Sequence, residues 1–459
     1  MSADGSLAGT LAAPGRPRWL NDRVLRATAS VAAAGIVVKI VATFKEIVLA
    51  GIYGRSDAMD AFLAAFLIPN LLINLVAESM NQALIPTLIR VRLQQGHARA
   101  QRLFSHSIAA TSVMLAVAAA CAAVLARFFF PLLASNYSAS KLHLAIQLFY
   151  VLLPCVVLGG IASNCAAVLN TLDRFAIPAL APLVVSVMII AAALTLHGVL
   201  GIWALAFATL AGGVLQAGVL VAGTCAHGYS FWPRWHGHDP DAREVTHQFV
   251  PVLLSSIVAS AGLLVDQAMA AMLPAGSVSA LVFAGRFVSV VLALLAGAIS
   301  SAIAPHFSEL VARRDWQACR DTLRAWTFRT TLVSVPIALA LIAGAHLLVR
   351  ATLQHGAFAA RDTRVVAPVL AMYAIQIPFF VVSRVFYRFI VAMRRTDLVF
   401  YCGGLNLVLD IVLNLVLMRC MGVAGIALAT SLWTVSTCAF LWYWARRLLS
   451  TAMITGASQ

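Results

Sequence analysis

The chain has 459 residues, of which 62% are hydrophobic and 11% are charged, and its mean hydropathy is +0.92. Soluble domains are only about half apolar, so this composition excludes a soluble globular protein and predicts a polytopic membrane protein. The formal net charge of +15 does not indicate nucleic-acid binding, because the basic residues gather in alternate loops between apolar stretches.

Apolar stretches long enough for a helix to cross a hydrocarbon core, about 20 residues, occur twelve times along the chain. In the first half they cover 27–53, 60–89, 105–134, 143–169, 177–199 and 201–224. In the second half they cover 247–273, 278–304, 327–351, 366–392, 398–418 and 422–445. We therefore predict an all-α polytopic membrane protein with about 12 transmembrane helices.

The N-terminal segment, 1–26, is polar and basic and contains glycine and proline. It lacks the short apolar region and small-residue cleavage site of a secretory signal peptide, so we expect a cytoplasmic tail. The eight cysteines lie mostly inside apolar segments without paired spacing. This pattern favours small buried side chains over disulfides or metal ligands.

Basic residues mark one side of the predicted spans. Arginines are frequent before the first span, after the second and between the eighth and ninth. The loops on the other side hold far fewer basic residues, chiefly Arg55, Lys141, Arg361, Arg364 and Arg419. By the positive-inside rule both termini are cytoplasmic, which requires an even number of spans. We expect the protein in the bacterial cytoplasmic (inner) membrane.

Sequence patterns recur between the two halves. Pro86 and Pro305 each precede a basic loop, and Gly201 and Gly422 each open a span, with nearly the same separation along the chain in both pairs. Six spans per half give both halves the same orientation, as in transporters that rock two lobes about a central site. We predict two pseudo-symmetric six-helix lobes around a central cavity. The predicted division is a tail at 1–26, a first lobe at 27–225, a linker at 226–246, a second lobe at 247–446 and a tail at 447–459.

Charged side chains at membrane depth are costly and are therefore candidate functional residues. Lys39 and Lys45 lie roughly 9 Å apart along the axis of the first span, and Glu46 follows. A cation pair suits a phosphate-containing ligand, with Glu46 balancing the charge when the ligand is absent. The alternatives are that Lys39 snorkels, or that Lys45 and Glu46 pair with polar neighbours. Asp60 begins the second span. Arg286 interrupts the eighth span with no acid within four positions, and we expect it to line the central cavity.

The second lobe has a different set of polar residues. Asn406, Asp410 and Asn414 recur every four positions and share one helical face, while Asp266 interrupts span 7 and Thr430 lies near the start of span 12. Two carboxylates with amide and hydroxyl oxygens suit a hard cation such as Na⁺, or the carboxylates could carry a proton. The alternative is a polar network that joins helices. The Na⁺ ligands that we predict are Asp266, Asn406, Asp410 and Thr430.

The sequence contains no phosphate-binding glycine loop with a lysine, no Cys/His metal spacing and no nucleophile motif. We therefore expect a secondary transporter rather than an enzyme or an ATP-driven pump. No cofactor is expected apart from a Na⁺ coupling ion.

Several motifs occur in chain order: FKEIVLAGIYG at 44–54, DAFLAAFLIPNLL at 60–72, QALIP at 82–86, LNTLDRFAIPALAP at 169–182 and GSVSALVFAGR at 276–286. Together they resemble the MurJ-type lipid II flippases of the multidrug/oligosaccharidyl-lipid/polysaccharide exporter superfamily. The resemblance covers nearly the whole chain, and the block from Asp60 to Pro86 is its most specific part.

The resemblance implies alternating access, with a lipid-linked glycan diphosphate moving from the inner to the outer leaflet. It implies that Lys45, Glu46 and Arg286 face the pyrophosphate and that Lys39 lies nearer the lateral portal. A sodium site in some members resembles the second-lobe set described above. The substrate-binding residues that we expect are Lys39, Lys45, Glu46, Asp60, Asn70, Glu78 and Arg286.

The chain departs from the family pattern at three points. Lys45 and Glu46 stand where the family has an Arg-Asp pair, and Ile73 stands where it has a central arginine. The sequence also stops soon after span 12, where many members continue with two further helices. The loss of a bidentate phosphate donor changes the expected head-group contacts, because lysine binds phosphate as a point charge.

The favoured function is therefore a flippase for a lipid II-like peptidoglycan precursor. The alternatives are a flippase for an exopolysaccharide or O-antigen lipid-linked unit, a cation-coupled multidrug antiporter, and a nontransporting scaffold in envelope synthesis. A drug cavity should be mostly apolar with acids, whereas Lys39, Lys45 and Arg286 favour an anion. The expected partners are the lipid-linked glycan, membrane lipids and envelope-biosynthesis proteins, but no nucleic acid.

Overall fold

The structure, a computed structural model, describes residues 22–133, 136–233 and 240–457. This part of the chain folds into sixteen helices and contains no strand. The first nine are α1 (Asp22–Tyr53), α2 (Asp57–Gln95), α3 (His97–Leu133), α4 (Ala139–Leu152), α5 (Pro154–Thr171), α6 (Ala176–Leu180), α7 (Pro182–Thr195), α8 (His197–Leu200) and α9 (Trp203–Ala226). The other seven are α10 (Pro240–Ala271), α11 (Ser277–Ala312), α12 (Trp316–Leu353), α13 (Ala360–Ala374), α14 (Gln376–Ala392), α15 (Thr396–Met421) and α16 (Val423–Ala457).

The predicted membrane spans correspond to these helices. Within the described residues, eleven helical segments are long and apolar enough to cross a membrane, and each coincides with one predicted span. The remaining predicted span, which is the first along the chain at 27–53, lies in α1. This helix carries Lys39, Lys45 and Glu46. The charged side chains of α1 mark it as a candidate functional helix.

Three predicted spans contain a break in the helix: the one at 177–199 breaks between α6 and α7 at Ala181, and the other two correspond between the halves. The span predicted at 143–169 consists of α4 and α5, which meet at Leu153, and the span at 366–392 consists of α13 and α14, which meet at Ile375. Pro154 occupies the first position of α5, where the missing N–H costs nothing but the preceding helix cannot continue unchanged. The breaks at Leu153 and Ile375 lie at equivalent places in the two halves.

The backbone turns repeat in the same way. Left-handed φ angles are unfavourable for most residues and therefore mark tight turns that the fold requires. Such residues occur in three pairs with nearly equal separation along the chain: Gly54 and Gly276, Asp173 and Arg394, and Gly201 and Gly422. Because these turns join equivalent helices, they support the internal repeat that the sequence motifs predict.

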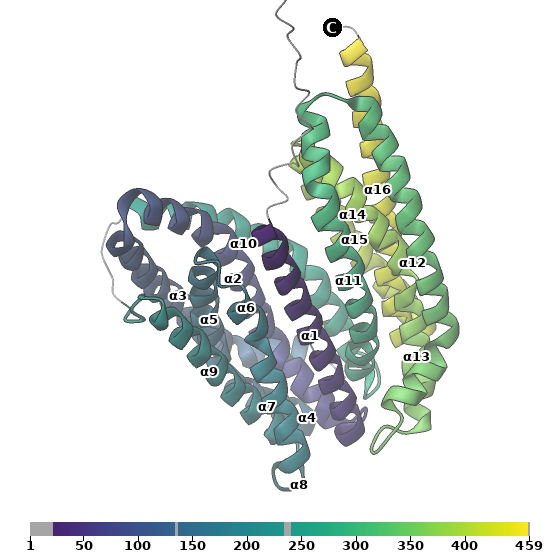
Figure 1. Cartoon of the computed structure of the whole chain (residues 1–459). Helices are drawn as coiled ribbons and strands as arrows, with labels where there is room; N and C mark the ends of the chain where they lie inside the picture. The colour runs from purple at the N-terminus through teal and green to yellow at the C-terminus, as the bar shows by residue number, and fades with distance from the viewer. Residues whose placement is uncertain (1–21, 134–135, 234–239, 458–459) are drawn as a thin grey trace, which may run out of the picture.

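Two helical bundles lean against each other (Figure 1). Helices α1–α9 form the first lobe and α11–α16 the second, while α10 packs against α2 and α3 as well as α15. The start of α10 is joined to the first lobe because the Asp241 carboxylate contacts Arg90 at 3.3 Å and Arg99 at 3.1 Å. Helix α1 lies beside α11.

The beginning of α1 and the end of α16 lie on the same side of the molecule, here called the terminal side (Figure 1). This placement agrees with an even number of spans. The α1–α2 connection lies at the opposite end of the bundles, here called the far side. The polar contacts that join the two lobes on the far side are the first part of the candidate site.

Candidate functional site

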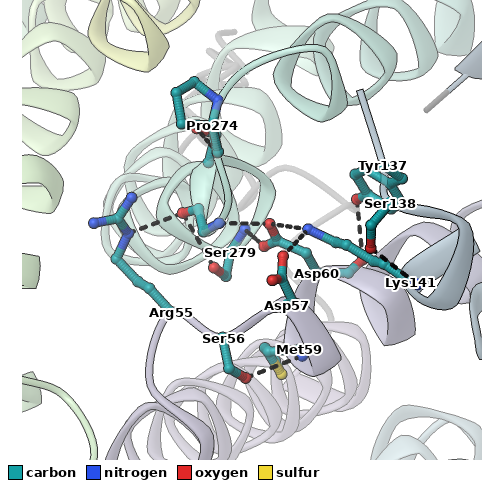
Figure 2. A network of polar contacts seen from close by, with 12 residues as sticks. Arg55, Ser56, Asp57, Met59, Asp60, Tyr137, Ser138, Lys141, Pro274 and Ser279 are labelled. Carbon is teal, nitrogen blue, oxygen red and sulfur yellow. Dashed lines mark hydrogen bonds and ion pairs between the residues drawn. The ribbon is translucent and has the colours of Figure 1, made fainter. Parts of the chain in front are cut away.

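The buried carboxylate of Asp60, at the start of α2, binds the beginning of α11 in the other lobe (Figure 2). Its Oδ2 accepts a hydrogen bond from the Gly276 amide at 2.7 Å, and its Oδ1 accepts one from the Ser279 amide at 2.9 Å. An acidic side chain is favourable here, because the first amides of a helix lack intrahelical partners and the helix dipole is positive at that end. Asp60 therefore acts as an N-cap for a helix in the opposite lobe.

Lys141 of α4 neutralises this carboxylate. Its Nζ lies 3.2 Å from Asp60 Oδ2 and 2.6 Å from Asp57 Oδ1, and it also lies over the ring of Tyr137, 4.0 Å from the centroid. The Tyr137 hydroxyl donates to the Asp60 carbonyl at 3.5 Å. Burial, followed by the nearby Asp60 and Asp57, raises the pKa of Tyr137, so its hydroxyl remains a donor at physiological pH. We call Asp60, Lys141, Gly276 and Ser279 the Asp60 clasp.

Gly276 fits this contact because it has no side chain. Its φ is +81°, and a Cβ at this position would lie 2.8 Å from Arg55 Cβ and 2.9 Å from the Arg55 carbonyl oxygen. The Gly276 carbonyl also accepts a hydrogen bond from Arg55 Nε at 2.9 Å. The two lobes thus approach backbone to backbone, which only glycine allows.

A second far-side contact joins α1 to the connection between α12 and α13. The Ala357 amide donates to the Gly51 carbonyl at 2.7 Å, and Arg55 Nη1 lies 3.4 Å from Asp362 Oδ1. The Arg55 side chain therefore contacts two separate elements of the second lobe. Together with the Asp60 clasp, these contacts hold the far side closed in this structure.

Deeper between the lobes, Glu46 of α1 holds two cations. Its Oε1 lies 3.0 Å from Lys45 Nζ and 3.2 Å from Arg286 Nη2, so one carboxylate oxygen joins α1 to α11. The Glu46 side chain is only 5% exposed, whereas the Arg286 side chain is 30% exposed. Among the described residues, Glu46 Oε2 and Arg286 Nε have no hydrogen-bond partner. We call Lys45, Glu46 and Arg286 the Glu46 cluster.

The acid that pairs with Arg286 is Glu46, from the other lobe. The sequence contains no acid near Arg286 in its own span, and the structure supplies one from the other lobe. Lys39 is half-buried in α1, close enough to Arg286 for their positive charges to interact. A region with three cations and one carboxylate has an excess of positive charge, which favours an anionic ligand.

The remaining residues that we expect to bind substrate lie in α2. Asn70 is half-buried, and the side chain of Glu78 lies outside the described residues. Ile73, which replaces the arginine of the family pattern, packs against α5: a Cβ added at Gly159 would lie 2.7 Å from Ile73 Cγ1. This position therefore contributes packing inside the first lobe rather than a phosphate donor.

The second-lobe polar residues meet around Asn414. Its amide nitrogen donates to Asp266 Oδ1 at 2.8 Å and to Asp410 Oδ1 at 3.1 Å, and Thr430 Oγ1 donates to Asp266 Oδ2 at 3.1 Å. We call these four residues the Asp266 cluster. Asn406 lies two helical turns from Asn414 and accepts a hydrogen bond from Thr437 instead. The sequence reasoning placed Asn414 on the right face but left it out of the predicted ligand set.

The Asp266 cluster retains free oxygen atoms. Asp410 Oδ2 and Asn414 Oδ1 are buried and have no hydrogen-bond partner among the described residues. The described residues contain no group of three or more His, Cys, Asp or Glu side chains arranged to hold a metal. The donor set is thus two carboxylates, an amide and a hydroxyl, which fits a weakly held monovalent cation or a proton better than a transition metal.

A cavity of about 950 Å³ lies between α2 and helices α10, α14, α15 and α16. We call it the interlobe cavity. Asn74 and Gln82 of α2, Asn406 and Asp410 of α15, and Arg384 of α14 contribute polar groups to its wall. Lys45 and Arg286 lie on α1 and α11, so the Glu46 cluster and the cavity use different helices.

Sequence reasoning missed the partners of Asp60. Lys141 and Arg55 stand out as rare basic residues in far-side loops, but only the folded chain shows that they lie beside acids. Gly276 had a detectable signal, because a glycine directly before an apolar helix indicates a turn with positive φ. The contact that it makes with Asp60 joins residues 216 positions apart and could not be read from local pattern.

In sequence, the chain is similar to known proteins of one family. The profile of the family described as "Lipid II flippase MurJ" matches residues 49–457. The chain is 30% identical over 362 residues to the lipid II flippase MurJ of Burkholderia cenocepacia, covering 77% of this chain and 70% of that protein. It is 25% identical over 468 residues to the probable lipid II flippase MurJ of Vibrio cholerae, covering 95% and 89%.

Two solved structures share the fold. A lipid II flippase MurJ in an inward closed conformation has a TM-score of 0.79 and 21% identity, over 91% of this chain and 87% of that one. An inward-facing multidrug resistance MATE family transporter of the MOP superfamily has a TM-score of 0.78 and 11% identity, over 93% and 99%. At these identities the likeness concerns the architecture of two helical lobes.

Proposed function

The chain belongs to the lipid II flippase MurJ family, and we propose that it moves a polyprenyl-diphosphate-linked saccharide of the lipid II type across a membrane. Transport runs from the inner to the outer leaflet of the bacterial inner membrane, with both termini cytoplasmic. The protein is a multi-pass transporter rather than a catalyst of bond formation or cleavage. Family membership supports the substrate class, and the Glu46 cluster supports the way in which the substrate is held.

The Glu46 cluster carries the proposal. A single buried carboxylate oxygen contacts Lys45 on the same helix and Arg286 across the lobe boundary. A diphosphate offers more oxygens and more negative charge than one carboxylate, so it competes with Glu46 for both cations. Pairing with Glu46 partly compensates the two cations while the site is empty, and the diphosphate replaces Glu46 on loading.

Alternating access follows from the far-side contacts. While the Asp60 clasp and the Arg55–Asp362 pair are formed, the two lobes are joined on the far side. Opening that side requires these contacts to break together. We therefore assign Asp60, which the sequence reasoning placed among the substrate ligands, to closure of the far side.

The Asp266 cluster is the proposed coupling site. Its two free oxygens, Asp410 Oδ2 and Asn414 Oδ1, provide ligands for Na⁺ or, at the carboxylate, for a proton. The cluster joins α10, α15 and α16, and α10 in turn packs on the first lobe. Cation binding there would change how α10 is held and thereby favour one lobe arrangement over the other.

A flippase for an exopolysaccharide or O-antigen unit remains the second candidate, because the same diphosphate chemistry would serve it and Ile73 removes one family phosphate donor. The test uses purified protein in vesicles loaded with fluorescent lipid II or with a lipid-linked exopolysaccharide unit. Transfer of lipid II to the outer leaflet, above that of protein-free vesicles, is the expected result. Transfer of the exopolysaccharide unit alone would assign the second function, and efflux of a cationic drug alone would assign an antiporter.

A further inference from the structure

The interlobe cavity contains an arginine that has no acidic partner within the described part of the chain. Arg384 of α14 lies in its wall, and no carboxylate among the described residues forms an ion pair with it. Its guanidinium lies over the ring of Phe380, 4.4 Å from the centroid, and 5.9 Å from that of Tyr387. Arg384 is half-buried. A charged side chain at membrane depth is costly and usually faces a cavity or a partner, so an arginine in a cavity wall without an acidic partner indicates an anionic ligand.

The guanidinium of Arg384 favours an oxyanion. The Phe380 ring holds the guanidinium in a cation–π contact. A guanidinium can donate two parallel hydrogen bonds from one edge. That edge matches a carboxylate or a phosphate, and Arg384 lies on a different helix from Lys45 and Arg286. The chain thus presents two separate positive centres toward the space between its lobes, one on α1 and α11 and one on α14.

The rest of the cavity wall suits a saccharide. Aromatic side chains, among them Tyr387 and Trp433, provide flat apolar faces, and Ser383, Thr434 and Asn406 provide hydroxyl and amide groups. Sugar rings have apolar faces and a rim of hydroxyl groups, so this mixture is complementary to them. The volume of about 950 Å³ lies at the upper end of ligand pockets, which usually span about 300–1,000 Å³.

We propose that the interlobe cavity binds the saccharide part of the transported lipid and that Arg384 binds a carboxylate carried by that head group. The inference rests on the proposed function, because it assigns a second contact point to the same substrate. The diphosphate engages the Glu46 cluster, and the distal, carboxylate-bearing part of the head group engages Arg384. A substrate with both groups is recognised at two points, and a lipid diphosphate without a carboxylate is recognised at one.

Binding measurements on the purified full-length protein test this assignment. The probes are lipid II, whose peptide carries carboxylates, the same lipid with those carboxylates amidated, a lipid-linked saccharide that bears a uronic acid, and polyprenyl diphosphate. The variants are Arg384→Gln, Arg384→Lys and the matched control Arg388→Gln. Arg388 lies one turn further along α14 and contacts the Tyr387 ring, at 5.8 Å, but it is not part of the cavity wall.

We expect Arg384→Gln to weaken lipid II binding by about tenfold or more, the usual effect of losing a charge-assisted hydrogen bond. Its affinity for polyprenyl diphosphate and for amidated lipid II should equal that of the wild type. Arg384→Lys should bind lipid II with intermediate affinity, because lysine keeps the charge but loses the planar fork. Arg388→Gln should bind all four probes normally.

Each other outcome has a defined meaning. Wild-type affinity of Arg384→Gln for lipid II would overturn the inference and leave the proposed function intact. Equal losses for lipid II and polyprenyl diphosphate would also overturn it, because Arg384 would then act on the diphosphate or on the fold. Arg384-dependent binding of the uronic-acid lipid without any binding of lipid II would keep the inference and reject lipid II as substrate. Wild-type protein that binds none of the probes would reject both proposals.

Discussion

Asp60 in the first lobe accepts a hydrogen bond from the backbone amide of Gly276 in the second, at 2.7 Å. The N-cap of α2 is its own Ser56, which accepts from the Met59 amide, whereas α11 has no side-chain cap of its own. The missing cap is supplied by the opposite lobe. Arg286 follows Ser279 by seven residues on α11, about 10 Å along the axis, so the clasp and the Glu46 cluster share one rigid helix.

Replacing Asp60 with asparagine should weaken far-side closure. The substitution removes the charge that favours the α11 terminus and leaves the exposed Asp57 as the acid that pairs with the buried Lys141. Loss of charge-assisted hydrogen bonds of this kind costs about 1–3 kcal/mol. Hydrogen exchange at the Gly276 and Ser279 amides should therefore become faster, and flipping should decrease.

Ser56→Ala is the matched control for this prediction. It removes the N-cap of α2 in the same connection, at a cost of about 1 kcal/mol, without touching the second lobe. Exchange at the Gly276 amide should stay at the wild-type rate in this variant. Equally faster exchange at the Gly276 amide in both variants would show that the exchange rate reflects general loosening of the α1–α2 connection rather than loss of the Asp60 clasp.

Gly276→Ala should prevent the lobes from closing normally. A Cβ would meet Arg55 at 2.8 Å, and the positive φ is unfavourable for alanine. The melting temperature and the flipping rate should both fall. Gly218→Ala in α9 is the control, because nothing lies within 4 Å of its added Cβ, and it should be neutral or slightly stabilising. Normal transport by Gly276→Ala would show that the backbone contact is dispensable.

Glu46→Gln should increase the affinity for polyprenyl diphosphate. The glutamine removes the carboxylate that competes with the ligand for Lys45 and Arg286. The same change leaves Lys45 and Arg286 without their carboxylate, so the ligand-free protein should melt at a lower temperature. Its melting temperature should then rise more than that of the wild type when ligand is added. Titration of wild type and variant, followed by melting temperature, measures both effects. Weaker binding by Glu46→Gln would mean that Glu46 contributes to the ligand contacts.

Asn414→Ala should disturb the second-lobe site more than Asn406→Ala. Asn414 donates to both Asp266 and Asp410, and its loss leaves two buried carboxylates without their shared donor, at about 1–3 kcal/mol. Asn406 contacts Thr437 and Cys402 instead. Thermal melting with and without Na⁺ measures the difference in stability between the two variants. Any increase in melting temperature that Na⁺ produces in the wild type should vanish in Asn414→Ala. A larger effect of Asn406→Ala would place the ion nearer the interlobe cavity.

The helical architecture was accessible from sequence because it depends on local composition. Apolar length predicted the spans, and the positions of Gly201 and Gly422 predicted the repeat, which the turns in the backbone reproduce. Proline effects were harder to predict. The breaks before Pro154 and at Ile375 divide two predicted spans, since an apolar run alone does not tell a straight helix from two joined pieces.

The candidate site was only partly accessible from sequence. Rare charges identified Glu46, Arg286 and Asp60, but charge does not specify which residues meet. The Glu46–Arg286 pair joins residues 240 positions apart, and its existence depends on α1 lying beside α11. From sequence we expected Asp60 among the substrate-binding residues, whereas its contacts in the structure join the two lobes on the far side.

The most direct test measures lipid II in the outer leaflet of vesicles that contain equal amounts of folded wild-type, Lys45→Ala or Arg286→Ala protein. The control is Arg313→Ala, whose exposed side chain pairs with Glu309 one turn away on the same helix. We predict that Lys45→Ala and Arg286→Ala each lower the flipping rate by about tenfold or more, the loss expected for a charge-assisted phosphate contact, while Arg313→Ala flips normally. Wild-type flipping by both Lys45→Ala and Arg286→Ala would contradict the central claim that these two cations bind the diphosphate.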